Sequence, residues 1–248
     1  MNRFSLLRQV VAVWLAVLFS LPASSARSAR IPELPDPGRP GMSKEKQEQL
    51  GLKTAAEVYK QMPVLPDSSA VTQYIQHLGK KLVEVIPPDR SWPYEFHVVQ
   101  QSDINAFALP GGPIFINVGT INAAANEAQL AGVMAHEMSH VYLQHSAKQA
   151  PKQQWASILG ALGGLVGGAA GDLAQAGIQI GAGTLLMKYS RGDEAQADAV
   201  GAIIMYKAGY DPREMAQFFQ SLQKNCGEWR AAISQRSPQP RQPRRSGE

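Results

Sequence analysis

The sequence contains a single cysteine, Cys226, among its 248 residues. One thiol cannot form an internal disulfide, so a disulfide-stabilised scaffold is excluded. No segment repeats at a fixed period, which excludes a solenoid or a fibrous array. A hydrophobic share of 44% with 18% charged residues is instead typical of a globular chain that can bury one or two cores.

The central part of the chain also lacks the excess of positive charge that a nucleic-acid-binding protein usually carries. The whole sequence has a net charge of +4, with 24 basic and 20 acidic residues. Two arginines in residues 1–26, and five arginines against one glutamate in residues 229–248, leave residues 27–228 with a net charge of −2. The positive charge is concentrated at the two ends, so we expect no nucleic-acid partner.

The first apolar run is shorter than the roughly 20 residues that a membrane-spanning helix needs. It covers residues 10–21, follows Arg3 and Arg8, and precedes small residues at positions 23–26. This order is typical of a secretory signal peptide, and the alternative is an uncleaved anchor. No cysteine lies near the cleavage region, so a lipoprotein is excluded. We expect residues 1–26 to be a signal peptide and the mature protein to be periplasmic.

The rest of the sequence predicts one domain between two irregular ends. Four prolines in residues 32–40 disfavour a helix, so residues 27–42 are expected to form an extended leader. Residues 228–248 are rich in Arg, Gln, Pro and Ser and are expected to be a disordered tail. The tail is expected to be free, with peripheral contact to an anionic membrane surface as the alternative. The domain is assigned to residues 43–227.

Helical and strand patterns in this domain predict an α+β fold. Three strand candidates and a Pro-Gly-Gly-Pro turn at residues 110–113 predict a small three-stranded sheet, antiparallel at least in part. The remaining segments are helical, and one of them begins at Asp211 with a proline at its first position. The strands are predicted over residues 94–99, 104–109 and 114–118, and the other helices over residues 43–61, 68–86, 126–146 and 190–209.

A glycine-rich segment lies between two of the predicted helices. It has nine glycines between Leu159 and Gly183, and Asp172 is the only charged residue from Gln153 to Met187. Three interpretations stay open because glycine permits both close packing and mobility. The segment is a packed loop leading into a helix, a flexible lid over a cleft, or an element that touches a membrane.

The predicted helix over residues 126–146 contains His-Glu-Met-Ser-His, an H-E-x-x-H motif. Four residues advance a helix by about 400°, so His136 and His140 lie one turn apart on one face, as two imidazoles must to share a zinc ion. Glu137 lies about 100° round the helix, where it could accept a proton from an attacking water. The alternative is a solvated helix that carries these letters by chance, but the surrounding stretch is apolar.

Zinc needs a third protein ligand, and the other histidines are poor candidates. The metzincin position for a third histidine is Ser146, so His145 is one residue out of register. We expect His145 to be a helix-end residue that interacts favourably with the helix dipole. His77 and His97 lie in predicted upstream elements and are expected to be structural.

Two carboxylates remain. Glu194 and Asp198 are four residues apart near the start of a later predicted helix, so they project from one face. One could bind the metal while the other accepts the free N–H of a ligand histidine. The alternative is a solvated acidic helix start, where both would favour the helix dipole.

Three motifs, in this order, resemble the zinc metallopeptidase family that includes the CAAX-prenyl proteases, the HtpX-like heat-shock proteases and the BepA-like enzymes. Residues 105–112, Asn-Ala-Phe-Ala-Leu-Pro-Gly-Gly, resemble its strand and turn. Residues 136–140 resemble its metal-binding helix, and residues 189–198 resemble its Ser-Arg-x-x-Glu-x-Glu-Ala-Asp segment, except that Gln196 replaces a glutamate. The resemblance covers about residues 44–225 and implies a zincin-like, mostly helical gluzincin domain with its small sheet beside the active-site helix.

The resemblance also implies roles for the matching residues. Glu194 would be the third ligand of one Zn²⁺ per chain. Asp198 would accept a hydrogen bond from the non-ligating N–H of a ligand histidine. BepA-like members continue into a helical repeat domain and carry a downstream histidine that can cover the zinc. No histidine follows His145 here, so we expect a minimal single-domain member without that switch. An extended substrate would pair with Asn105, Ala106, Phe107 and Ala108, and Arg191 is a candidate transition-state stabiliser.

Together these features predict an exported zinc metalloendopeptidase. We expect it to hydrolyse peptide bonds of unfolded or misassembled envelope proteins, as part of protein quality control. The alternative is a periplasmic chaperone or adaptor that binds such proteins with little proteolysis.

Overall fold

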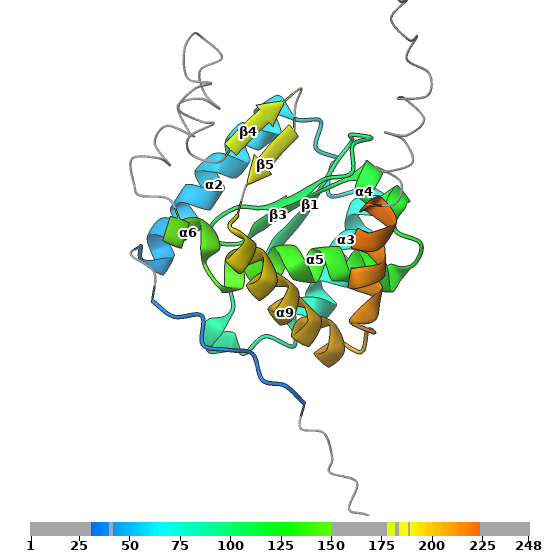
Figure 1. The fold of residues 1–248 in the computed structure, drawn as a ribbon. Coiled ribbons are helices and arrows are strands. Elements are labelled where there is room, and N and C mark those ends of the chain that lie inside the picture. The colour runs from blue at the N-terminus through cyan, green and yellow to red at the C-terminus, as the bar shows by residue number, and fades with distance from the viewer. Residues whose placement is uncertain (1–30, 40–41, 150–177, 182–183, 188, 224–248) are drawn as a thin grey trace, which may run out of the picture. The chain divides into compact units, whose positions relative to one another are not determined.

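The computed structural model describes residues 31–39, 42–149, 178–181, 184–187 and 189–223. Within these residues the chain is mostly helical and contains a three-stranded sheet (Figure 1), which confirms the predicted α+β class. The predicted signal peptide (1–26) and tail (228–248) lie outside the described residues. The assignment of residues 43–227 to one domain stays a prediction.

The three predicted strands form one sheet. They are β1 (Glu95–Val99), β2 (Ala106–Ala108) and β3 (Pro113–Asn117), in the spatial order β1-β3-β2. Strand β3 is parallel to β1 and antiparallel to β2, so the sheet is antiparallel in part. The order leaves β2 at an edge.

The turn between β2 and β3 is pressed against helix α2 (Lys44–Gln61). Gly111 has a φ of +80°, in the left-handed region that favours glycine. A Cβ atom at this position would lie only 2.4 Å from the Cα of Glu48 in α2. Both the backbone and the packing therefore require glycine here.

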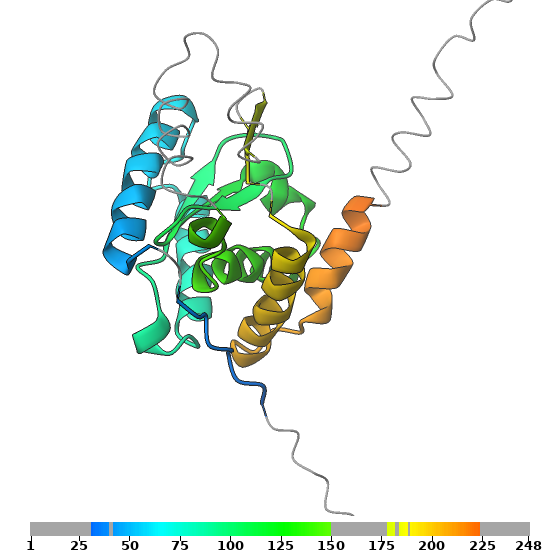
Figure 2. The same ribbon diagram turned by 60° about the vertical axis from the view of Figure 1, so that its left-hand side comes forward.

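Helices cover both faces of the sheet (Figure 2). Ile114 and Ile116 of β3 belong to the larger apolar cluster, together with residues of α3 (Ala70–Val83) and α5 (Glu127–Tyr142). Phe115 points the other way, into a smaller cluster with residues of α2. All five residues of β3 are buried, so this strand is the centre of the domain core.

Most long helices begin where the sequence predicts. The side chains of Ser43, Ser69, Asn126 and Ser190 each accept a hydrogen bond from the first turn that follows. The ends of the helices are less well predicted. Helix α3 ends at Val83, three residues before its predicted end, and α5 ends at Tyr142, four residues before its predicted end. Helix α9 (Arg191–Lys207) is followed by Gly209, and a further helix covers residues 213–223.

Several short elements were not predicted. Helix η1 (Pro88–Arg90) precedes β1, α4 (Val118–Ala123) follows β3, and α6 (His145–Gln149) follows α5. Strands β4 (Ile178–Gly181) and β5 (Thr184–Met187) pair antiparallel. Residues 178–181 belong to the glycine-rich segment and form a strand, which differs from one of its three interpretations, the packed loop leading into a helix. Residues 159–177 and 182–183 of the glycine-rich segment lie outside the described residues.

Residues 33–39 of the predicted leader belong to no helix or strand and lie along the end of α5 and along α6. Leu34 is buried in the larger cluster. The Tyr142 hydroxyl donates a hydrogen bond to the carbonyl of Pro35 (2.7 Å), and the Lys148 ammonium donates to that of Pro37 (2.9 Å). Because proline has no N–H, the leader is held mainly through its carbonyl oxygens.

Candidate metal centre and active site

Helix α9 packs along α5, and Gly201 faces the α5 backbone. A Cβ atom on Gly201 would lie 3.2 Å from the backbone nitrogen of His136. Glu194 and Asp198 lie seven and three residues before Gly201, so all three share one face of α9. The close approach of the helices brings both carboxylates to the histidines of α5.

The side chains of His136, His140 and Glu194 converge. The two Nε2 atoms are 3.1 Å apart, and Oε2 of Glu194 lies 3.3 Å from Nε2 of His136 and 3.9 Å from Nε2 of His140. One ligand atom from each residue lies within 4.8 Å of the others. Among the described residues, these three form the group of metal-ligating side chains that could hold an ion.

The spacing of the three atoms fits a small cation. Ligand atoms about 2.0–2.1 Å from a tetrahedral zinc ion lie about 3.3–3.4 Å from one another. The observed separations of 3.1, 3.3 and 3.9 Å span that value. Two imidazole nitrogens and one carboxylate oxygen are also a donor set used by catalytic zinc sites.

The protonation states of the two histidines are linked. Burial opposes the charged form of His136, but hydrogen bonds with Asp198 and Glu194 outweigh it and raise the pKa of His136 to about 10. Burial and the charge of His136 lower the pKa of His140 far below its ordinary value. An imidazole binds a metal through an unprotonated nitrogen, so a metal ion at this position must displace the extra proton that His136 holds.

Asp198 contacts the opposite side of His136. Its Oδ1 lies 3.0 Å from the Nδ1 atom of His136. A carboxylate on the non-ligating ring nitrogen fixes the tautomer and the orientation of an imidazole. The carboxylate of Glu194 therefore faces the Nε2 atoms of both histidines, and that of Asp198 faces the Nδ1 atom of His136.

Glu137 is half-buried beside this cluster. Burial raises the pKa of Glu137 to about 7, although the charge of His136 and a hydrogen bond with the backbone of Ala108 favour its ionised form. A carboxyl group that titrates near neutral pH can both accept and release a proton. The contact with Ala108 also ties Glu137 to the edge strand β2.

Strand β2 turns alternate backbone groups toward the edge that faces away from β3. Leu109 N–H donates to the carbonyl of Pro113 (2.8 Å), and Asn117 N–H donates to the carbonyl of Asn105 (3.0 Å). In an antiparallel ladder, the intervening Ala106 and Ala108 then point their N–H and C=O groups away from β3.

The four residues predicted to bind substrate therefore differ in position. Ala106 is half-buried at this edge, whereas Ala108 is buried and its backbone is hydrogen-bonded with Glu137. The side chains of Asn105 and Phe107 are buried, and the Phe107 ring stacks on Phe115 with a centroid distance of 5.1 Å. Phe107 thus packs in the core of the domain.

His145 is not the helix-end residue that we expected. Helix α5 ends at Tyr142, Gln144 adopts a left-handed φ of 58°, and His145 begins α6. This break turns His145 back toward α5, so its Nδ1 lies 2.9 Å from Nδ1 of His140. The expectation assumed a continuous helix, which would have carried His145 about 140° away from His140. Glycine or asparagine usually marks a left-handed helix end, so Gln144 gave no signal of the break.

Two aromatic rings that the sequence analysis did not assign enclose the histidines. Tyr189 stacks on His140 with centroids 3.9 Å apart, and its hydroxyl is 2.8 Å from Oγ of Ser146. Phe219, in the helix over residues 213–223, lies edge-on to His136 at 5.5 Å. Tyr189 begins the segment that carries the family resemblance, which is the signal that could have identified it.

The other candidate residues lie on three different elements. Arg191 is exposed at the first position of α9, and His77 is exposed on α3. His97 is buried, and its Nδ1 lies 2.8 Å from the Tyr59 hydroxyl. Its ring packs on Phe115, in the face of the sheet that α2 covers.

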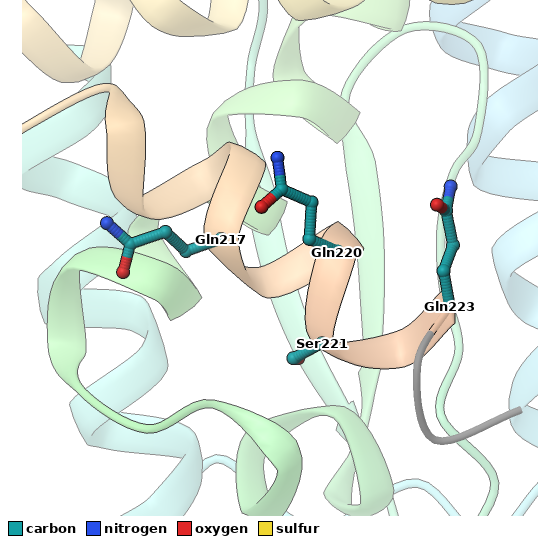
Figure 3. A pocket seen from close by; sticks show the side chains of 4 residues that line it. All are labelled: Gln217, Gln220, Ser221 and Gln223. Atoms are coloured by element: carbon teal, nitrogen blue, oxygen red, sulfur yellow. The ribbon is translucent and has the colours of Figure 1, made fainter. Parts of the chain in front are cut away.

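A pocket of about 600 Å³ lies along the helix over residues 213–223 (Figure 3). The residues that line it have amide or hydroxyl side chains: Gln217, Gln220, Ser221 and Gln223. Met215 and Phe218 of the same helix are buried. These four side chains carry no group that titrates near neutral pH, so the described part of the lining offers no acid or base for hydrolysis.

The sequence was compared with known proteins. The model of peptidase family M48 matches residues 69–245. The Beta-barrel assembly-enhancing protease of Escherichia coli (strain K12) is 30% identical over 210 residues, covering 81% of this chain and 42% of that protein. The protein of the same name from Yersinia pestis is 35% identical over 159 residues, covering 61% and 32%. Mitochondrial metalloendopeptidase OMA1 of Schizosaccharomyces pombe is 29% identical over 178 residues, covering 71% and 51%. The chain spans about a third to a half of the length of these relatives.

Proposed function

This chain belongs to peptidase family M48, and from that premise we propose that it is an exported zinc metalloendopeptidase. We further propose that it cleaves unfolded or misassembled proteins of the cell envelope. The observation that carries the proposal is the convergence of His136, His140 and Glu194, with the carboxyl group of Glu137 beside them and the edge of β2 within hydrogen-bonding reach of Glu137.

We propose that His136, His140 and Glu194 hold the metal through Nε2, Nε2 and Oε2. Zinc bound there would polarise the scissile carbonyl and lower the pKa of the attacking water. The two histidines must be neutral to bind it, so His136 would give up its extra proton when the metal binds. Asp198 keeps the proton of His136 on Nδ1, which leaves Nε2 free as the ligand atom.

Glu137 is proposed as the general base and then the general acid. Its carboxylate accepts a proton from the attacking water and delivers it to the leaving amine. Burial favours the first step, because it disfavours the charged form of Glu137 and so strengthens the binding of the proton. With a pKa of about 7, Glu137 can still pass the proton on to the amine. The Ala108 hydrogen bond limits the positions that the carboxylate can take.

The edge of β2 that faces away from β3 is proposed as the surface that receives the substrate. An extended peptide can add to an exposed sheet edge through main-chain hydrogen bonds, which do not depend on its side chains. Unfolded proteins offer such segments and folded proteins do not. Asn105, Phe107 and the buried Ala108 would then support the strand from within the core, while the backbone of the half-buried Ala106 contacts the peptide. Arg191 remains a candidate for stabilising the transition state.

The proposed location rests on the predicted signal peptide in residues 1–26. In the described parts of the chain, no helix combines the length and the apolar character needed to cross a bilayer. Two of the relatives are named for enhancing β-barrel assembly, which supports envelope proteins as the substrate class. N-terminal sequencing of the exported protein tests the location: a chain that begins between Ser25 and Arg30 is expected, and one that begins at Met1 would contradict cleavage.

The test of the activity is cleavage of casein, an unfolded protein, by the purified protein with its metal content measured in parallel. We expect about one zinc per chain and cleavage that a zinc chelator abolishes. Glu137→Gln is expected to slow cleavage by about 10²- to 10⁴-fold, the usual contribution of a general acid–base group. It should retain zinc, because Glu137 is not proposed as a ligand.

Two further variants sharpen this test. Glu194→Gln is expected to lose both zinc and cleavage, since it removes a ligand charge. Glu57→Gln is the matched control, because Glu57 lies on α2 and pairs with the exposed Lys60. It should keep the wild-type rate. Binding of casein without cleavage by the zinc-loaded wild type would contradict the peptidase and support a chaperone or adaptor.

A further inference from the structure

We propose that His145 is a positioning residue for the metal: it accepts a hydrogen bond from Nδ1–H of His140 and so fixes the tautomer and orientation of that ligand. The Nδ1 atoms of the two residues are 2.9 Å apart. Both side chains are almost fully buried, with exposed fractions of 1% for His145 and 2% for His140. This inference rests on the proposed binding of zinc by His140.

The direction of the hydrogen bond follows from the ligand atom. Nε2 of His140 faces Nε2 of His136 and Oε2 of Glu194, so it must be unprotonated when it binds a metal. A neutral imidazole carries one proton, which must then be on Nδ1. Nδ1 of His140 is therefore the donor and Nδ1 of His145 the acceptor.

The same reasoning places the proton of His145. With Nδ1 acting as acceptor, neutral His145 carries its proton on Nε2. That atom lies 3.7 Å from Oδ1 of Asp193, slightly beyond hydrogen-bonding distance. Asp193 is itself fixed by Ser190, whose Oγ donates to its carboxylate (2.6 Å) in the capping box of α9. A chain of polar contacts thus leads from the ligand His140 through His145 to the first turn of α9.

The backbone turn that places His145 next to His140 is strained. Gln144 has a φ of 58°, in the left-handed region, where a residue other than glycine is strained. Its side chain accepts a hydrogen bond from Gln47 of α2 (2.9 Å), which helps to hold the strained turn. The turn is what reverses the chain after α5 and directs His145 at His140.

Tyr189 restricts the movement of His140 by packing against the face of its ring. Its ring is stacked on that of His140, with an angle of 15° between the planes. The Tyr189 hydroxyl is hydrogen-bonded to Ser146, the residue after His145. His140 is therefore confined by a ring on its face and a hydrogen-bond acceptor at its edge, whereas His136 is held by the carboxylate of Asp198.

Two substitutions of His145 distinguish a role in positioning His140 from a role in packing alone. In His145→Asn, the amide oxygen is bonded to Cγ, as Nδ1 is in histidine, so it can still accept from His140. In His145→Leu, a side chain of similar size offers no acceptor. Both lose the contact with Asp193, so a merely structural role for His145 would affect both variants alike.

The experiment measures the zinc dissociation constant of the full-length wild type and both variants by competition with a chromogenic chelator at one pH. The thermal midpoint of each metal-free protein is measured alongside. We expect His145→Leu to bind zinc about 10- to 100-fold more weakly, the usual effect of removing a partner of a ligand histidine. His145→Asn should stay within about 3-fold of wild type, although both variants lower the metal-free midpoint similarly.

Two results would overturn the proposal. They are unchanged zinc affinity in His145→Leu, and an equal loss in both variants that follows the loss of thermal stability. Failure of the wild type to bind zinc would instead contradict the proposed metal site, and this inference with it.

The wild type alone provides a second measurement if a variant does not fold. Nitrogen-15 NMR of the zinc-loaded protein reports the tautomer of each histidine. Protons on Nδ1 of His140 and on Nε2 of His145 are expected. A proton on Nδ1 of His145 would show that it cannot be the acceptor and would overturn the proposal.

Discussion

The two ends of helix α5 are held in place by different kinds of contact. We call residues 126–130 the capped end and residues 136–142 the site end. At the capped end, the carboxylate of Glu127 accepts hydrogen bonds from the hydroxyls of Tyr74 (2.9 Å) and Tyr210 (2.6 Å). Glu214 accepts from the side chain of Asn126 (3.0 Å). These contacts lie at the surface and depend on the negative charge of two carboxylates.

The site end depends on buried and backbone contacts. Leu34 packs into the core, Tyr142 is fully buried, and its hydroxyl bonds the leader at the carbonyl of Pro35. In the turn between β2 and β3, Gly111 leaves no room for a side chain against α2. The carboxyl group at this end, that of Glu137, is half-buried, and burial raises its pKa.

This difference indicates that the two ends of α5 tolerate change to different degrees. Exposed charged hydrogen bonds are individually weak and respond to pH and salt, so the capped end can change without moving the metal cluster. Close packing tolerates little change, so the site end can hold side chains at fixed separations. Substitutions at the two ends should therefore differ in size, in pH dependence and in their effect on metal binding.

The largest expected effect is that of Gly111→Ala. Its Cβ would approach both the Cα and the backbone nitrogen of Glu48 closer than real atoms do, at 2.4 and 2.6 Å. Strain at φ +80° adds to this clash. We expect a loss of more than about 3 kcal/mol in the free energy of unfolding, measured by urea denaturation.

Gly209→Ala is the matched control, at the same end of the molecule as Tyr210. Gly209 has a φ of +86°, but a Cβ atom there would have no neighbour within 4 Å. Only the backbone strain remains, so a loss of about 1 kcal/mol is expected. Similar losses in the two variants would contradict the proposed difference in packing.

The next largest effect is expected for Leu34→Ala. Leu34 is only 7% exposed, and its replacement removes buried apolar surface and leaves a cavity. We expect a loss of about 2–3 kcal/mol by urea denaturation. Leu52→Ala is the control, because Leu52 is 58% exposed and its replacement should change stability by less than about 0.5 kcal/mol. Equal effects would show that the leader does not contribute to the core.

A third prediction concerns Glu137 in the metal-free protein. Folding raises the pKa of Glu137 from 4.5 to about 7, so the unfolded chain releases this proton at lower pH than the folded protein. The folded state therefore loses stability as pH rises from about 4.5 to 7. The loss is at most about 3 kcal/mol.

Glu137→Gln cannot ionise, so it should lack this loss. Urea denaturation of chelator-treated wild type and Glu137→Gln at pH 5 and pH 8 measures the difference. The variant is expected to be the more stable protein at pH 8 and to differ little at pH 5. A constant difference between the two proteins at both pH values would contradict the burial of an uncharged Glu137.

Features that the sequence predicts well are local ones. The N-caps at Ser43, Asn126 and Ser190 act within one helical turn, and the start of each helix was predicted within two residues. The facing of His136 and His140 also follows from helix geometry alone. For Glu194 and Asp198, spacing predicted a shared face, but only the family resemblance suggested which of them faces the metal.

Features that were missed depend on residues distant in the chain. His145 reaches His140 because Gln144 is left-handed, and Gln144 contacts Gln47, which lies 97 positions away. The hydrogen bond between Ala108 and Glu137 depends on how β2 pairs with β3. The parallel pairing of β1 with β3 skips a strand in the chain order, which residue alternation alone does not reveal.

The smallest expected effect is that of Glu127→Gln at the capped end. Hydrogen bonds from Tyr210 and then Tyr74 lower the pKa of Glu127. Its carboxylate therefore stabilises the fold above the ordinary value of 4.5, and this contribution is lost as pH falls through the lowered pKa. Because the residue is exposed, the loss of stability in Glu127→Gln at pH 7 should stay below about 1 kcal/mol.

The sign of this pH dependence is opposite to that of Glu137, although both residues belong to one helix. Urea denaturation of Glu127→Gln beside wild type should show a difference at pH 7 that shrinks toward pH 3. Zinc affinity, measured by chelator competition, should remain that of wild type, because the variant leaves the site end unchanged. Weaker zinc binding in Glu127→Gln would show instead that the two ends of α5 are coupled, since a change in surface charge would then have moved the ligand histidines.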